Sequence, residues 1–157
     1  MSEYWLRKAE PFDVRRIYEF SKEYLLESLQ GKKFELDENT ALETFNIAVQ
    51  VPDMYETYIA ESDKGLLGVM ILLFSSSFFK GEECDVEFFY VAQNARGTGV
   101  SRALVEKCVE IKKDRGLNII YAGCHSSFDD SGKNDKMFKN LFMKYGFEVT
   151  GTNLHLA

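Results

Sequence analysis

The sequence predicts one domain of mixed α/β class, with a mixed sheet of six to seven strands, about four helices and one parallel βαβ unit. Three observations favour this class. The chain has 157 residues, of which 45% are hydrophobic, so residues 1–157 suffice for one core and are too few for two ordinary domains. Apolar residues recur at three- and four-residue steps in some segments and alternate in others. Between residues 84 and 124 the pattern changes from strand to helix and back to strand.

The first half of the chain is expected to contain a strand, two helices and a strand pair. Asp13 is a candidate N-cap before the first run of helical spacing, and Gly31 ends that run. The apolar run over residues 66–74 suits a strand that is buried on both faces. The expected elements are a strand over residues 4–9, a helix between Asp13 and Gly31, a shorter helix that follows Asn39 and Thr40 and ends before Pro52, and strands over residues 55–61 and 66–74.

The second half is expected to contain the βαβ unit, a last helix and a terminal strand or hairpin. Gly99 precedes a helical run that ends at Arg115 and Gly116, with Lys112 and Lys113 near the negative end of the helix dipole. Because strand-helix-strand crossovers are right-handed, the two flanking strands should be parallel. The expected elements are strands over residues 84–91 and 117–124 around this helix, a helix over residues 135–145, and a strand or hairpin over residues 147–156.

Charge and cysteine content exclude several classes of protein. Nineteen Lys plus Arg against 25 Asp plus Glu give a net charge of −6, which argues against nucleic acid as a main partner. Cys84, Cys108 and Cys124 are odd in number and form no C-x-x-C, and only His125 and His155 offer imidazole ligands. We therefore expect no disulfide framework, no metal site and a reducing compartment.

The sequence also lacks the pattern of a targeting or membrane segment. The first residues do not show the charged-then-apolar order of a secretory signal, and the longest apolar run, residues 66–74, is half a membrane span. We expect a cytoplasmic protein, monomeric or homodimeric, that does not contact membranes.

The turn over residues 93–101, Gln-Asn-Ala-Arg-Gly-Thr-Gly-Val-Ser, is the candidate binding site. Gly97 and Gly99 permit close approach to the backbone, and the N–H groups of the helical turn that follows lack intrahelical acceptors. The helix dipole adds about half a positive charge and Arg96 a full one, so a phosphate or pyrophosphate is the expected ligand. Alternatively, the glycines only shape a tight strand-to-helix turn. Neither G-x-x-x-x-G-K-[ST] nor the three-glycine dinucleotide motif is present.

Two motifs point to a known family. The string from Phe88 to Leu104 resembles the core motif of the GNAT superfamily of acyl-CoA-dependent N-acyltransferases, in which a strand ending in Val leads into R-G-x-G and a helix. The string from Leu141 to Phe147 is similar to the closing motif of that family, L-Y-x-K-x-G-F. The expected order of elements also agrees over nearly the whole chain. The resemblance implies a GNAT-like three-layer fold with the parallel βαβ unit at the cofactor site.

The resemblance further implies acetyl-CoA as acyl donor. Its pyrophosphate would lie on the N–H groups of residues 96–100, and its pantetheine arm between the strands over residues 84–91 and 117–124. Asn94 stands where the family usually has Gln or Arg, which would weaken one phosphate contact. The expected cofactor-binding residues are Tyr90, Val91, Arg96, Gly97, Thr98, Gly99, Val100 and Ser101.

The family's usual general acid is missing. Phe142 replaces the Tyr of L-Y-x-K-x-G-F, and a phenyl ring cannot protonate the departing thiolate. Thiolate is a tolerable leaving group because its pKa is near 8.5, so activity need not end. Tyr145 and His125 are candidate substitutes. The alternatives are core packing for Tyr145 and a surface or capping role for His125.

Glu87 is the candidate general base. It lies four residues before Val91, so in a regular strand it shares a face with Phe89 and Val91, toward the expected acceptor amine. The family often has a Glu near this point. The alternative is a solvated surface glutamate. Asp85, of the same parity, is the reserve candidate.

The resemblance and the residues together predict an N-acetyltransferase that moves acetyl from acetyl-CoA to a primary amine by direct attack in a ternary complex. The acceptor is a small molecule or a peptide, and acidic residues around the site favour a cationic one. One alternative is a catalytically degenerate module that binds acyl-CoA as a sensor or scaffold. A more remote alternative is an interaction domain in which the glycine-rich turn has no ligand.

Overall fold

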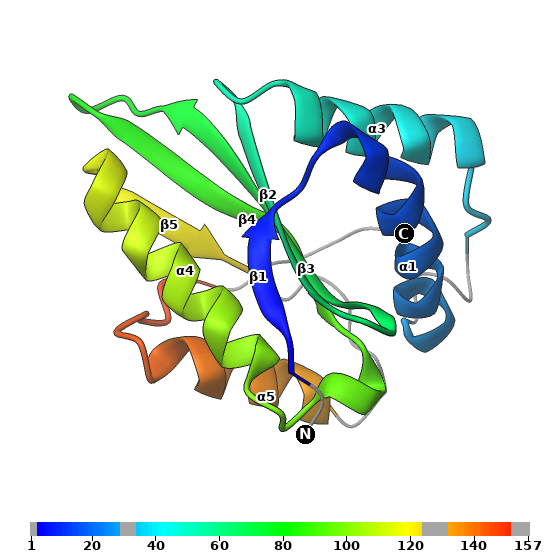
Figure 1. Ribbon diagram of the computed structural model, residues 1–157. Helices are drawn as coiled ribbons and strands as arrows, with labels where there is room; N and C mark the ends of the chain where they lie inside the picture. Colours follow the sequence, from blue (N-terminus) through cyan, green and yellow to red (C-terminus); the bar gives the residue numbers. More distant parts are fainter. Residues whose placement is uncertain (1–2, 29–33, 124–131, 152–157) are drawn as a thin grey trace.

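The computed structural model describes residues 3–28, 34–123 and 132–151 (Figure 1). Four α-helices and five strands lie within these ranges. In chain order the elements are β1 (Trp5–Lys8), η1 (Pro11–Asp13), α1 (Val14–Glu27), α3 (Glu38–Gln50), β2 (Tyr55–Ser62), β3 (Gly65–Ser76), β4 (Glu82–Val91), η2 (Gln93–Ala95), α4 (Val100–Arg115), β5 (Ile119–Ala122) and α5 (Lys133–Met143).

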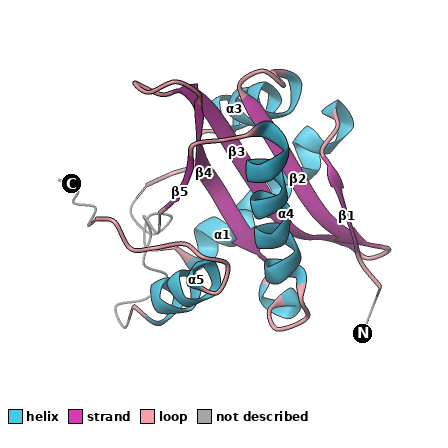
Figure 2. Cartoon of the chain, turned by 90° about the vertical axis from the view of Figure 1, so that its left-hand side faces the viewer, coloured by secondary structure: helices cyan, strands magenta, loops and turns pink. Residues whose placement is uncertain are grey.

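The strands form one mixed sheet in the order β1-β2-β3-β4-β5. The first three pairs are antiparallel, and β4 and β5 are parallel on either side of α4, which confirms the predicted βαβ unit. Helices α1 and α3 cover one face of the sheet, and α4 and α5 cover the other (Figures 1 and 2). The fold is therefore a three-layer α/β arrangement, as predicted.

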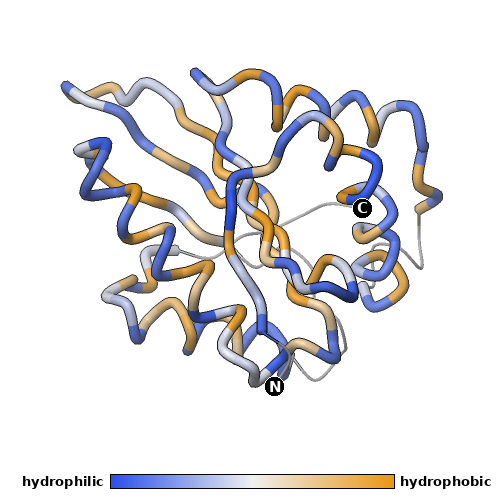
Figure 3. Tube along the Cα trace, viewed as in Figure 1, coloured by the Kyte–Doolittle hydropathy of each residue, from blue (hydrophilic) through white to orange (hydrophobic). Residues whose placement is uncertain are grey.

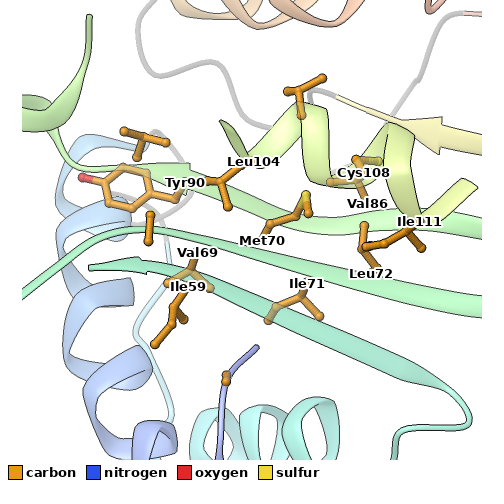
Figure 4. Close-up of a cluster of buried hydrophobic side chains, with 14 of the residues drawn as sticks. Ile59, Val69, Met70, Ile71, Leu72, Val86, Tyr90, Leu104, Cys108 and Ile111 are labelled. Carbon is orange, nitrogen blue, oxygen red and sulfur yellow. The ribbon is translucent and has the colours of Figure 1, made fainter. Parts of the chain in front are cut away.

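The core is centred on β3. Five consecutive residues, Gly68–Leu72, are buried because one helical layer lies against each face of the strand. Figure 3 shows the apolar positions concentrated along this part of the sheet, and Figure 4 shows β3 side chains reaching both layers. The prediction of a strand buried on both faces is confirmed.

Helix boundaries follow local hydrogen bonding. The Asp37 carboxylate accepts the Thr40 N–H at 2.7 Å, so α3 begins at Glu38, slightly before the predicted start after Asn39 and Thr40. Gly116 ends α4 in the left-handed region, with φ of 65°.

The sequence suggested that the Asp13 side chain caps α1, but in the structure it makes no capping hydrogen bond to this helix. Its buried carboxylate accepts hydrogen bonds from Arg7 at 2.7 and 3.0 Å, from Arg16 at 2.6 Å and from the Glu10 N–H at 2.9 Å. Glu61 on β2 accepts from the same two arginines. This ion-pair cluster fastens β1 and β2 to the start of α1.

The sheet has fewer strands than predicted within the described residues. Residues 147–151 form no strand, and their side chains beyond Phe147 are exposed, so none of them pairs with the free edge of β5. The rest of the predicted terminal strand, residues 152–156, lies outside the described residues. None of the described helices is long and apolar enough to cross a bilayer.

Candidate active site

A β-bulge interrupts β4 at Glu87. Ile71 of β3 pairs with Phe88 and Leu72 with Val86, so Glu87 has no partner in the ladder. On the other side, β4 pairs with β5 only from Glu83 to Val86. Within the described residues β5 ends at Ala122, opposite Val86, just where the bulge bends β4 and increases its local twist.

Beyond Val86, one edge of β4 has no strand partner in the part of the chain that the structure describes. The Ala92 N–H donates to the Leu67 carbonyl of β3 at 3.0 Å. In an antiparallel ladder, alternate residues direct both N–H and C=O to the same neighbour. The backbone groups of Phe89 and Val91 therefore point away from β3, to the side where β5 no longer pairs. This edge can hydrogen-bond an extended ligand in the manner of an added strand.

The bulge also changes which side chains share a face. Phe88 packs against Tyr24 and Phe45 of the α1/α3 layer, with ring centroids 5.3 and 6.3 Å away. Cys84, four residues earlier, instead lies on the α4 side, where burial and then the nearby Cys108 raise the pKa of the Cys84 thiol. The alternation is thus offset by one residue, and Asp85 faces the α1/α3 layer.

The shared parity of the two carboxylates does not survive the bulge. Glu87 is exposed and is itself the unpaired residue, so strand alternation does not determine its face. Asp85 lies before the bulge, so it is offset from Phe89 and Val91, in contrast to the regular alternation that the sequence suggested. The catalytic roles of Glu87 and Asp85 therefore stay predictions.

The turn between β4 and α4 has an open backbone. Gly97 and Gly99 adopt φ of 80° and 99°, which favours glycine at both positions. The first intrahelical bond of α4 runs from the Ala103 N–H to the Gly99 carbonyl at 2.9 Å, so the N–H groups of Val100, Ser101 and Arg102 have no intrahelical acceptor. A Cβ built on Gly97 would meet nothing within 4 Å. These donors and the helix dipole make the turn a suitable anion site.

Arg96 is held within the protein. Its Nη2 donates to Glu27 Oε2 at 2.7 Å, and its Nε donates to the Val91 carbonyl at 3.1 Å. The Tyr90 hydroxyl donates to the other Glu27 oxygen. The charge of Arg96 is thus paired, whereas the sequence suggested that it would be free for a phosphate. The buried Tyr90 side chain points to α1, so only the Tyr90 backbone lies near the turn.

Glu27 remains ionised in this arrangement. Burial by itself would raise the pKa of Glu27, but hydrogen bonds from Tyr90 and Arg96 favour the carboxylate and hold its pKa below the usual range. Burial, followed by the bond to Glu27, raises the pKa of Tyr90. The carboxylate, the phenol and the guanidinium form one connected unit between the last residue of α1 and the turn.

The sequence matches the family model described as "Acetyltransferase (GNAT) family" over residues 14–147, which covers both the bulged strand and the turn. The chain belongs to the GNAT acetyltransferase family. This assignment places it among acyl-CoA-using acetyltransferases. No curated protein sequence matches the chain.

Solved structures agree with this GNAT fold. An integron cassette protein from the mobile metagenome of Cole Harbour Salt Marsh has a TM-score of 0.76 at 21% identity, covering 97% of this chain and 88% of that one. A protein described as a predicted acetyltransferase from Clostridium acetobutylicum, solved with acetyl-CoA, has a TM-score of 0.72 at 18% identity, covering 99% and 96%. The aminoglycoside N-acetyltransferase AAC(6')-Iy, solved with CoA, has a TM-score of 0.75 at 14% identity, covering 100% and 95%.

The residue in the place of the GNAT general acid is part of an aromatic cluster. Phe142 is buried, stacks on Phe138 at 4.3 Å, and contacts Phe89 of β4 at 5.3 Å and Phe147 at 5.0 Å between ring centroids. This cluster fastens α5 to the unpaired part of β4. Phe142 thus has a packing role at the position where the sequence resemblance leads us to expect a tyrosine.

The other proposed proton donors lie apart from Phe142 or cannot be placed. The Tyr145 hydroxyl donates to Glu106 Oε1 of α4 at 2.9 Å, and partial burial and this bond raise the pKa of Tyr145. Tyr145 thus links α5 to α4. His125 lies outside the described residues.

A cavity of about 1170 Å³ lies between β5, α5 and the chain that follows α5. Of the predicted site residues, Tyr145 and the reserve candidate Asp85 line this cavity, whereas Glu87 and the turn do not. Within the part of the chain that the structure describes, no group of three or more His, Cys, Asp or Glu side chains could hold a metal ion.

Glu27 is the residue that sequence reasoning missed. It lies 69 positions before Arg96, at the end of an amphipathic helix where a glutamate is ordinary. No local motif signals its contact with the turn, because that contact depends on how α1 packs on β4.

Proposed function

We propose that this protein is an N-acetyltransferase that takes the acetyl group from acetyl-CoA and transfers it to a primary amine by direct attack in a ternary complex. The observation that carries the proposal is the continuity of the turn with the unpaired edge of β4. Anion-binding N–H groups lie at one end of this edge, and the bulge at Glu87 lies at the other.

The donor side fits an acyl-CoA. The N–H groups of Gly97, Gly99, Val100 and Ser101 suit a pyrophosphate, which needs several donors and a positive dipole, whereas the Thr98 N–H already donates to the Ala95 carbonyl at 3.3 Å. The backbone groups of Phe89 and the N–H of Val91 suit the amides of a pantetheine arm, which can pair with a strand edge, while the Val91 carbonyl accepts from Arg96. In this proposal Arg96 and Tyr90 support the turn, and the residues on either side of Thr98 contact the cofactor through the backbone.

The chemistry assigned to the chain is proton transfer and positioning. Acetyl-CoA supplies an activated thioester. Glu87, directly or through water, accepts a proton from the bound ammonium group, so that the neutral amine attacks the thioester carbon. The C–N bond forms, the C–S bond breaks, and the nitrogen loses its second proton to water, while CoA leaves as a thiolate that takes its proton from solvent or from a group other than Phe142.

The acceptor is proposed to be cationic. Glu83, Asp85 and Glu87 on β4 give this end of the strand a negative field that attracts an ammonium group. The solved aminoglycoside N-acetyltransferase with this fold is an example of such an enzyme. Small amines and peptide amines both fit this description.

A second function is supported by Phe142. The aromatic cluster that replaces the usual acid suits a protein that binds acyl-CoA without turnover, as a sensor or scaffold. Binding alone would then be the activity of the turn and the strand edge.

One experiment separates the two functions. Acetyl-CoA binding is measured by calorimetry, and thiol release is measured with a panel of polyamines, aminosugars and a lysine peptide. Binding with amine-dependent thiol release supports the enzyme. Binding without release by any amine supports the binding module, and no binding contradicts both.

A further inference from the structure

We propose that Glu27 is a positioning residue for the cofactor turn, which acts through Arg96 and Tyr90 to hold the turn in its ligand-binding conformation. This inference rests on the proposed use of acetyl-CoA. It concerns a residue outside both GNAT-like motifs and a contact between two elements far apart in the sequence.

The contacts are close and mostly shielded from water. Glu27 Oε2 accepts from Arg96 Nη2 at 2.7 Å, and Glu27 Oε1 accepts from the Tyr90 hydroxyl. The Glu27 side chain is 16% exposed, the Arg96 side chain 33%, and Tyr90 only 2%. Hydrogen bonds with an ionised partner in such a place are stronger than neutral ones. Phe20 and Tyr24 of α1 pack against the Tyr90 ring and fix its direction.

The position of Glu27 in α1 does not favour the helix itself. It is the last residue of α1, where the negative end of the helix dipole disfavours an acidic side chain, and the last turn contains no basic residue. Its favourable interactions lie instead with Arg96 and Tyr90. The residue therefore contributes to tertiary contact with the turn rather than to α1.

Arg96 transmits the restraint to the ligand-binding backbone. Its Nε also donates to the Val91 carbonyl at 3.1 Å, so the side chain bridges the two ends of the segment from Val91 to Arg96. Gly97 follows directly, and glycines at positive φ have wide conformational freedom when nothing restrains them. Ordering such a turn on binding would weaken the affinity, so a turn ordered in advance binds more tightly.

The test compares Glu27→Gln with Glu23→Gln. Glu23 lies one turn earlier on α1, is exposed, and acts on Tyr90 only through space, with no hydrogen bond or ion pair to a described residue, so Glu23→Gln removes the same charge without the hydrogen bonds. Calorimetry gives the Kd for acetyl-CoA, and steady-state kinetics give kcat and KM. Glu27→Gln should raise the Kd and the KM for acetyl-CoA about tenfold and leave kcat nearly unchanged, while Glu23→Gln should change neither.

A double mutant tests the route through Arg96. Arg96→Gln alone should weaken acetyl-CoA binding to a similar degree, and adding Glu27→Gln to it should have little further effect. Tyr90→Phe removes one bond to the same carboxylate and should weaken binding about threefold. This variant also serves if Glu27→Gln does not fold, since it keeps the aromatic ring.

Each outcome decides the inference. An unchanged Kd in Glu27→Gln, even with a lower melting temperature, would show a purely structural residue. Tighter binding of acetyl-CoA by Glu27→Gln would show that Glu27 keeps Arg96 away from the phosphates and does not position the turn. Additive effects in the double mutant would exclude the route through Arg96. If the parent protein does not bind acetyl-CoA, the proposed function fails and this inference with it, whereas parent binding with an unaffected variant overturns this inference alone.

Discussion

Replacing Gly97 by Asp or by Asn separates the shape of the turn from its charge. Gly97 has φ of 80°, and a Cβ added there meets nothing within 4 Å, so neither side chain clashes with the protein. Asp and Asn both tolerate the left-handed region better than other residues, and they have nearly the same shape. The two variants therefore share the same conformational penalty and differ by one negative charge.

The charge should act in opposite directions without and with the ligand. Without ligand, a carboxylate beside the positive end of the α4 dipole stabilises by about 0.3–1 kcal/mol, so Gly97→Asp should melt about 1–4 °C above Gly97→Asn. With a pyrophosphate on the turn, two like charges about 5 Å apart repel by roughly 1–3 kcal/mol, which weakens binding about ten- to a hundredfold. The more stable variant is thus expected to be the weaker binder.

Calorimetry with acetyl-CoA and thermal melts of both variants test this reasoning. The difference in Kd should shrink when the salt concentration is raised toward 1 M, because salt screens exposed charges. Equal Kd values for Gly97→Asp and Gly97→Asn at low salt would refute the placement of the pyrophosphate at this turn. A difference that does not respond to salt would refute the electrostatic cause.

Three further outcomes are expected. Glu87→Gln should keep the Kd for acetyl-CoA and lower kcat about a hundredfold, measured by thiol release, and an unchanged rate would leave Glu87 as a surface carboxylate. Phe142→Tyr should raise thiol release or leave it nearly unchanged, and a large loss would mean that the aromatic packing itself is needed for turnover. Asp13→Asn should lower stability by about 1.5–3 kcal/mol at neutral pH, since Arg7 and Arg16 lose one buried carboxylate partner and keep the other, Glu61. Burial raises the pKa of Asp13, but the arginines outweigh this and the net pKa is lowered, so its stabilisation is present above the unfolded pKa near 4 and is lost as pH falls through the lower folded value. Melts from pH 7 to pH 2 should therefore show the parent and the variant converging below about pH 4, and a constant gap would contradict this.

Local patterns in the sequence predicted most of the fold. The buried strand β3 follows from its continuous apolar run, and the end of α4 follows from Gly116 after a basic last turn. The conformations of Gly97 and Gly99 were also predictable, since a strand that turns sharply into a helix needs positive φ. In each case the deciding interactions lie within a few residues of one another.

The features that sequence reasoning missed depend on distant pairing. The bulge at Glu87 arises from pairing with β3, where one residue of β4 has no partner. The pattern of β4 alone places Asp85 and Glu87 on the same face, so it cannot reveal the bulge. The contact between Glu27 and Arg96 depends likewise on the packing of α1. A terminal strand or hairpin was predicted over residues 147–156, but residues 147–151 form no strand, because beyond Phe147, which packs on Phe142, their side chains are exposed.

The bulge and the turn together set a length and a direction for the bound donor. Between Val86, where pairing with β5 ends, and Ala92, where the chain leaves the strand, β4 has five residues with one free edge. A phosphate held at the turn anchors one end of a ligand, and backbone pairing with Phe89 and Val91 directs the rest along the strand. At about 3.4 Å per residue, the four steps from Val91 to Glu87 span about 14 Å. In the proposed function, a donor arm that follows this edge brings its reactive end to the level of Glu87, the proposed base.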